Sequence, residues 1–166
     1  MIRTEIPECK TSDCRDHVAG KSKYCKVHKK IARENWKRNV MEQEAERAER
    51  YERFARIADE AYEAGLQAAK ACTPNVMIVT DPRTGHAYEP VTEGPCGFAE
   101  IRFAGNTSFG HWAKKNLGAR KAYGRGVYLW VSMFGQSHDR KAAYARAYAQ
   151  VLRNNDIDAW ASSRLD

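Results

Sequence analysis

The 166-residue chain has room for one compact domain and an appendage, with 43% apolar and 30% charged residues. No apolar run approaches the roughly 18 residues of a membrane span, and the first residues lack the apolar core of a secretory signal, so we expect a cytoplasmic protein with no membrane partner. The net charge of +7 is concentrated at both ends of the chain, which favours contact with a polyanion, although surplus lysine can also serve solubility alone.

The first thirty residues contain three of the five cysteines, at the spacing C-x4-C-x10-C-x2-H. Two close-set ligand pairs separated by a loop are typical of a structural zinc site, where Zn²⁺ supplies folding free energy that a short segment lacks. The predicted ligands are Cys9, Cys14, Cys25 and His28. The spacing of three between Cys25 and His28 places both on one face of a helical turn. His17 is a competing ligand, and unconnected thiols beside a surface histidine are the structural alternative.

These residues, together with the flanking Lys23-Tyr24 and Lys29-Lys30, resemble the small Cys-Cys-Cys-His zinc finger of many bacteriophage proteins. The resemblance covers residues 9–28. That finger often stands beside HNH nuclease modules or alone in small DNA-associated proteins, so the resemblance implies zinc and a basic environment but no activity. An HNH catalytic element would need further histidines and an asparagine in a ββα-metal arrangement, and no such arrangement is recognisable in the sequence, so nuclease chemistry is not implied.

From Lys29 to Cys72 the sequence has no proline and glycine only at Gly65. Strong helix formers predominate, which predicts one long helix, or two with a break near Gly65. Its apolar stripe is small, and we expect it to dock on the C-terminal domain or on another copy, which leaves open a homodimer through residues 42–72. The expected domains are a zinc finger at 1–30, a long amphipathic helix at 31–72 and a small α/β sheet domain at 73–166.

Cations gather at the start of this helix, next to the finger. Helical spacing brings most of them to one face, where they can neutralise about five phosphates. An aromatic residue among them can either stack on a base or pack against the finger. The residues assigned here to nucleic-acid contact are Lys26, Lys29, Lys30, Arg33, Trp36 and Lys37.

Residues 73–166 are predicted to form a β-hairpin followed by β-α-β-α-β, a small sheet with helices mainly on one side. The whole chain is therefore expected to be an α+β protein with a treble-clef-like finger at its N-terminus. The stretches 105–109 and 162–166 resemble uncharacterised phage proteins, which implies no function. The predicted strands are 76–80, 86–91, 98–103, 127–132 and 157–161. One predicted helix ends near Leu117, and the other spans 138–154.

The run 111–125 combines cations and aromatics without an acid, which is typical of a nucleic-acid face. Its candidate contacts are Lys114, Lys115, Arg120, Lys121 and Arg125. The strand that follows resembles the RNP1 element of RNA-recognition motifs, but its aromatics fall one position late and the expected element order differs from β-α-β-β-α-β. Alternation places Tyr128 and Trp130 on one face, where they stack on bases if that face is open and form core if both faces are covered.

No catalytic constellation is recognisable, since the histidines and carboxylates follow no known spacing and there is no glycine-rich phosphate loop. The leading hypothesis is a non-catalytic, phage-type zinc-finger protein that binds DNA or RNA and holds a structural Zn²⁺. One alternative is an adaptor or inhibitor that docks on a host nucleic-acid machine, such as a polymerase or ribosome, through the acidic helix at 42–72. Another is a metal-dependent nuclease.

Overall fold

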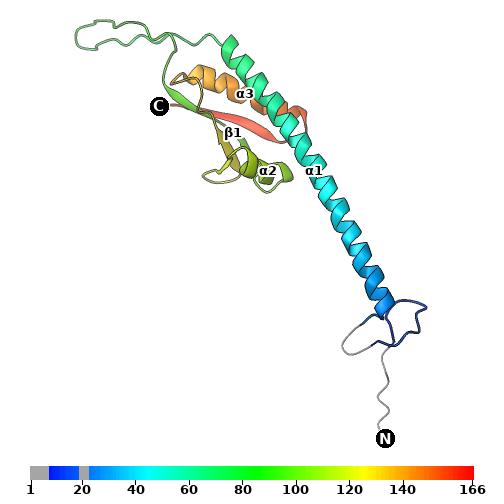
Figure 1. The fold of residues 1–166 in the computed structure, drawn as a ribbon. Coiled ribbons are helices and arrows are strands. Elements are labelled where there is room, and N and C mark those ends of the chain that lie inside the picture. Colours follow the sequence, from blue (N-terminus) through cyan, green and yellow to red (C-terminus); the bar gives the residue numbers. More distant parts are fainter. Residues whose placement is uncertain (1–7, 19–22) are drawn as a thin grey trace. The chain divides into compact units, whose positions relative to one another are not determined.

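The structure, a computed structural model, describes residues 8–18 and 23–166 (Figure 1). These ranges hold three helices and a four-stranded antiparallel sheet, so the protein is mixed helix and sheet. The chain divides into two compact units, Met1–Arg50 (unit 1) and Tyr51–Asp166 (unit 2). None of the helices in the described ranges has the length and apolar character needed to cross a membrane.

The first helix, α1, spans Lys26–Ala71 without a break at Gly65, which was one of the two predicted arrangements. The division between the units falls inside this helix. In unit 1 the helix follows a knuckle in which the backbone N–H of Cys9 donates to the carbonyl of Asp16 at 3.0 Å. An antiparallel bridge between Glu8 and His17 closes the same loop.

Unit 2 contains β1 (Gly97–Phe103), α2 (Ser108–Asn116), β2 (Arg120–Lys121), β3 (Val127–Trp130), α3 (His138–Asn154) and β4 (Ala159–Leu165). The order is therefore β-α-β-β-α-β, with the strands arranged β2-β3-β1-β4. The sequence prediction of β-α-β-α-β was wrong because β2 has only two residues, both of them charged, and offers no alternating apolar pattern.

The predicted hairpin at 76–91 does not join this sheet. Its two arms pair only through isolated bridges, Met77 with Val91 and Thr80 with Ala87. The turn between them is held by the Asp81 carboxylate, which accepts the N–H of Arg83 at 2.8 Å. Val76 and Ile78 are 57% and 60% exposed, so the apolar residues that suggested a strand are not buried against a second layer.

The core of unit 2 lies on one face of the sheet. Along β1, residues 97, 99, 101 and 103 are buried and alternate with half-buried neighbours. The buried side chains of β1 share one apolar cluster with residues of α1, α2 and α3, and Figure 1 shows α3 and the second half of α1 on the same side of the strands. The predicted docking of the apolar stripe of α1 is confirmed for its part from Phe54 to Ala69.

Candidate metal centre and basic surfaces

Unit 1 brings together four metal-ligating side chains. One ligand atom from each of Cys9, Cys14, Cys25 and His28 lies within 4.8 Å of all the others. Cys9 and Cys25 are buried, and Cys14 and His28 are half-buried. The group is the one predicted from the spacing, and it can hold a metal ion.

Three of the separations between these atoms are close to the edges of a tetrahedron around a zinc ion. A tetrahedral zinc ion with ordinary Zn–S and Zn–N lengths places sulfur pairs about 3.8 Å apart and sulfur–nitrogen pairs about 3.6 Å apart. The Sγ atoms of Cys14 and Cys25 are 3.9 Å apart. Nδ1 of His28 lies 3.5 Å from Cys9 Sγ and 3.3 Å from Cys25 Sγ. All three thiols are free, so no disulfide competes for this geometry.

Two local features of the backbone position the ligands. Between the first two cysteines, the N–H of Cys14 donates to the carbonyl of Thr11 at 3.2 Å, in a turn where Asp13 has a φ of 63°. Aspartate tolerates this left-handed conformation better than most residues do. At the second pair, the carbonyl of Cys25 accepts the N–H of Lys29 at 3.0 Å, so the first turn of α1 holds His28 beside Cys25.

The thiols of this group differ in acidity. Hydrogen bonding to the Thr11 side chain, aided by the Cys25 N–H, lowers the pKa of Cys9 to about 6 despite its desolvation. For Cys14 a backbone hydrogen bond from Asp16 lowers the pKa, but burial and the neighbouring thiols of Cys25 and Cys9 outweigh it and raise the value to about 11. Crowding of this kind opposes three thiolates side by side, and a bound cation relieves it.

His17, the competing ligand, lies outside this group. It is exposed, and its backbone pairs with Glu8. His17 was an alternative because histidine is a frequent zinc ligand. In the structure, the first turn of α1 places His28, and not His17, beside the cysteines.

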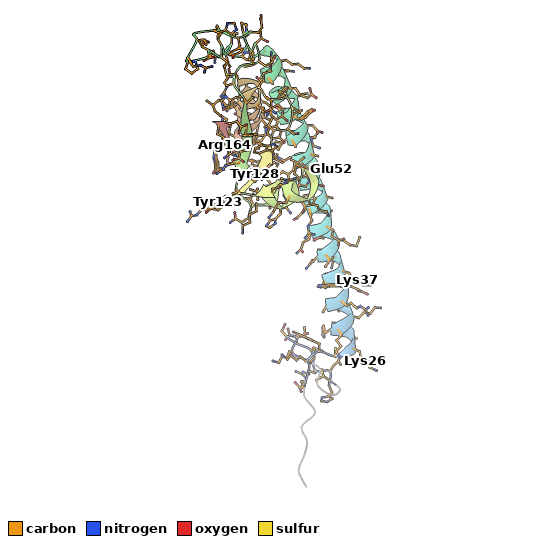
Figure 2. The ribbon with its side chains drawn as sticks, turned by 90° about the vertical axis from the view of Figure 1, so that its left-hand side faces the viewer. Lys26, Lys37, Glu52, Tyr123, Tyr128 and Arg164 are labelled. Carbon is orange, nitrogen blue, oxygen red and sulfur yellow. The ribbon has the colours of Figure 1, made fainter. Side chains whose placement is uncertain are left out.

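The basic start of α1 is exposed along its length, and Figure 2 labels Lys26 and Lys37 on it. At 3.6 residues per turn, five of its cations fall within about 100° of arc. Trp36 is 65% exposed, so its indole does not pack into the finger and stays open to a ligand. Residues 23–41 contain seven Lys or Arg and a single acid, Glu34. The five cations on this face are Lys26, Lys29, Lys30, Arg33 and Lys37.

The second predicted patch lies in unit 2, beside the sheet. Lys114 and Lys115 are exposed in the last turn of α2, where Nζ of Lys114 donates to the Gly105 carbonyl at 2.9 Å. Arg120 and Lys121 form β2, and Arg125 lies in the loop before β3. A hollow of about 630 Å³ at this end of the sheet is lined by Lys114, Lys121 and Arg125 together with Trp160 and one acid, Asp158.

Two acidic residues of unit 2, Glu100 and Asp139, make structural contacts. The Glu100 carboxylate accepts a hydrogen bond from Nε of Arg102 at 2.6 Å. Asp139 accepts the backbone N–H of Asn75 at 2.8 Å and contacts Nδ1 of His138 at 3.3 Å. The N–H of Asn75 lowers the pKa of Asp139 most, with His138 second.

Sequence reasoning missed the aromatic and basic residues of β1 and β4. Phe98, Trp160 and Arg164 share the face of the sheet on which Tyr128 and Trp130 lie. An i,i+2 pattern of aromatic and polar residues runs along both strands and was the available signal. It was obscured because β4 was predicted to end at residue 161, before Arg164.

In comparisons with known proteins, no family model matches the chain, and no curated protein or solved structure matches it.

Proposed function

We propose that this is a phage-type zinc-finger protein that binds DNA or RNA without catalysing a reaction. In this proposal the metal centre acts as a structural clip that fixes the start of a basic helix, and the charges beside the metal make the contact. The observation that carries the proposal is the cationic face of α1, which begins at Lys26, between the ligands Cys25 and His28.

Zinc is the ion that best suits the donor set. Three thiolates and one imidazole are soft to borderline ligands that favour zinc over the hard cations magnesium and calcium. Four protein ligands complete a tetrahedron and leave no open position for a substrate, as in structural rather than catalytic zinc sites. The likeness of residues 9–28 to phage zinc fingers agrees with this choice.

The electrostatics of the helix start suit a phosphate backbone. Five exposed lysines and arginines on one face can each displace a condensed counterion, and this makes the affinity strongly dependent on salt. The nearest acid in the sequence, Glu34, lies at the edge of this face, about 80° from Lys26 around the helix. The cations of 111–125 in unit 2 provide a second basic surface for the same class of ligand.

Charge reversal at the helix start tests this function. The variant Lys29→Glu/Lys30→Glu/Arg33→Glu should bind a DNA duplex more than roughly tenfold more weakly at moderate salt, because it removes three of about five phosphate contacts. A matched control, Arg47→Glu/Arg50→Glu/Arg53→Glu, makes the same change in net charge at exposed positions further along α1. Equal losses in the two variants would show that only net charge matters and would overturn the assignment.

The same variants separate this proposal from the adaptor alternative. Residues 41–50 of α1 are exposed and rich in glutamate, so they offer a surface to a host protein. A host protein that still co-purifies after nuclease treatment, while the first variant binds nucleic acid normally, would favour the adaptor function. Loss of nucleic acid from the purified first variant but not from the control supports the proposal made here.

A further inference from the structure

The uncovered face of the sheet in unit 2 carries an ordered arrangement of aromatic and cationic side chains. Strand register places Arg120 opposite Tyr128, Tyr128 opposite Arg102, and Arg102 opposite Trp160. Cation and aromatic residues therefore alternate across all four strands in a single row. Neighbouring strands are about 4.8 Å apart, so each ring in the row has a guanidinium within reach.

The next two rows extend this surface. Trp130 lies opposite Glu100 in the second row, and Phe98 lies opposite Arg164 in the third. The ring centroids of Phe98 and Trp130 are 5.4 Å apart, and those of Tyr128 and Trp130 are 6.5 Å apart. The guanidinium of Arg164 lies over the Phe98 ring at 5.4 Å from its centroid. Trp130 and Trp160 are each 46% exposed, so their rings remain open to a ligand.

Most of these side chains line an open hollow of about 740 Å³, which reaches from Arg164 across the sheet to Lys121 and Tyr123. Trp160 lines the neighbouring hollow, beside Lys114 and Arg125. Figure 2 labels Tyr123, Tyr128 and Arg164 on unit 2. Lys121 also lines the hollow at the end of the sheet, so one path connects the sheet face to the cations at Lys114 and Arg125.

The charges on this face favour an anionic ligand. Arg102, Arg120 and Arg164 share the open side. The acid in the lining of the larger hollow is Glu100, which pairs with Arg102 at 2.6 Å, and Asp158 lines the neighbouring hollow beside Trp160. The cation Lys141 is buried behind the face, with Nζ donating to the Gly97 carbonyl at 2.9 Å and lying 5.6 Å from the centroid of Phe98. The face therefore combines positive charge with flat aromatic rings.

We propose that this face binds single-stranded nucleic acid, with bases stacked on Tyr128, Trp130 and Trp160 and phosphates held by the arginines. Aromatic rings gain stacking energy only from bases whose faces are accessible, and a duplex hides those faces inside its own stack. The proposal rests on the proposed function for the class of ligand, but it assigns a separate site in unit 2 and a preference for single strands over duplex.

The test uses the full-length protein with Trp36→Phe, which leaves Trp130, Trp160 and the buried Trp112 as fluorophores. The probes are oligo-dT, oligo-U and a DNA duplex, each of about 15 nucleotides per strand. Both single strands should quench the tryptophan emission, and the duplex should leave it nearly unchanged. Comparison of oligo-dT with oligo-U then determines which sugar the face prefers.

Replacing each stacking ring gives the second readout. Trp130→Ala and Trp160→Ala should each weaken single-strand binding by about 5- to 150-fold, since stacking on an aromatic ring contributes about that much per base. Tyr88→Ala removes an exposed aromatic side chain from the segment 76–91, outside the sheet, and should leave binding unchanged. Both tryptophans are half-exposed, and unchanged circular dichroism of each variant confirms that it folds.

The outcomes for the two sites can be distinguished. Unchanged single-strand binding in both tryptophan variants, with loss in Lys29→Glu/Lys30→Glu/Arg33→Glu, would overturn the sheet site and leave the helix start in place. Loss in the tryptophan variants alone supports the sheet site even if the helix start binds nothing. Equal affinity for duplex and single strands without quenching would also overturn the inference.

Discussion

Gly65 of α1 lies directly against the ring of Tyr144 in α3. A Cβ atom added to this glycine would lie 2.6 Å from Cε2 of Tyr144 and 2.7 Å from its Cδ2. Tyr144 is buried, and its ring also contacts those of Tyr62, Phe134 and Tyr148. The ring is therefore enclosed by other aromatic side chains, and the absence of a side chain at 65 allows the two helices to approach this closely.

We predict that Gly65→Ala destabilises unit 2. Overpacking of a filled core costs about 1–3 kcal/mol, and the better helix propensity of alanine offsets about 1 kcal/mol of it. The net loss is up to about 2 kcal/mol of unfolding free energy, measured by urea denaturation.

A double-mutant cycle identifies the cause. Tyr144→Leu removes the ring, so Gly65→Ala should cost less in that background than in the wild-type protein. Gln67→Ala, at an exposed position two residues further along α1, should be nearly neutral. A loss that is the same with and without Tyr144 would refute the packing explanation.

Gly65 also shows which part of the fold could not be predicted from the sequence. The glycine was considered as a helix break because propensity is a local quantity, whereas its role is set by a ring 79 positions further along the chain. The long helix, β1 and α3 were predictable from apolar periodicity and strong helix formers. The Thr107 cap was predictable as well, and its Oγ1 accepts the N–H of Gly110 at 3.0 Å. Ser137 is likewise the N-cap residue of α3, but its hydroxyl donates to the Glu93 carbonyl at 2.7 Å and makes no capping hydrogen bond to the helix.

For the candidate sites, what could be predicted from the sequence depended on how close together in the chain the residues lie. The four candidate metal ligands could be predicted because they form two pairs with short spacings in the sequence. The sheet face could be predicted only in part. Its first row consists of Arg120, Tyr128, Arg102 and Trp160 from four different strands, and the register of these strands is set by the tertiary fold. The prediction that Tyr128 and Trp130 share one face was correct. Which face is open became clear only from the structure, where the helices pack on the opposite face.

Removing the metal is predicted to unfold the knuckle and leave unit 2 intact. The purified protein should hold about one zinc ion per chain. A chelator should abolish amide exchange protection around Cys9 and Cys25, while β1 and α3 stay protected because their core contains none of the four ligands. Hydrogen exchange read by mass spectrometry separates the two regions.

Single ligand changes refine this prediction. His28→Ala should weaken zinc binding by more than the 10- to 100-fold typical of a lost outer-shell partner. His17→Ala is the matched control, since His17 lies outside the group, and it should retain zinc. Retention of zinc by His28→Ala together with its loss from His17→Ala would show that the wrong histidine has been assigned.

The salt dependence of duplex binding gives a quantitative check on the helix start. If about five cations contact phosphates, log K should fall with log salt with a slope of about −4 to −5. Lys29→Gln should make the slope shallower by about 1 and weaken binding to all sequences alike. Lys70→Gln, a neutralisation in the last turn of the same helix, should leave the slope unchanged. An unaltered slope in Lys29→Gln would remove that lysine from the contact.

Asp139 is predicted to make unit 2 less stable in acid. Its carboxylate accepts the backbone N–H of Asn75 at 2.8 Å and the side-chain amide of Asn75 at 3.1 Å, and it lies in the first turn of α3. The Asn75 N–H, with His138 and the Asn75 amide in support, lowers the pKa of this carboxyl below its usual value. A lowered folded-state pKa means that the stabilisation is present above the unfolded value of about 3.9 and is lost as the pH falls through the folded value.

Asp139→Asn should therefore lower the unfolding free energy at pH 7 by about 0.3–1 kcal/mol, since it removes a negative charge at a helix N-terminus. The difference from the wild-type protein should begin to shrink below about pH 4, where the carboxyl of the unfolded chain takes up its proton, and should vanish as the pH falls through the lower folded-state pKa. Urea denaturation across the range from pH 3 to pH 7 measures both effects, with the exposed Glu60→Gln as a control for general loss of charge. A difference that stays constant over this range would contradict the role of the charge. It would mean that the carboxyl contributes through its shape and hydrogen bonds, which asparagine does not reproduce.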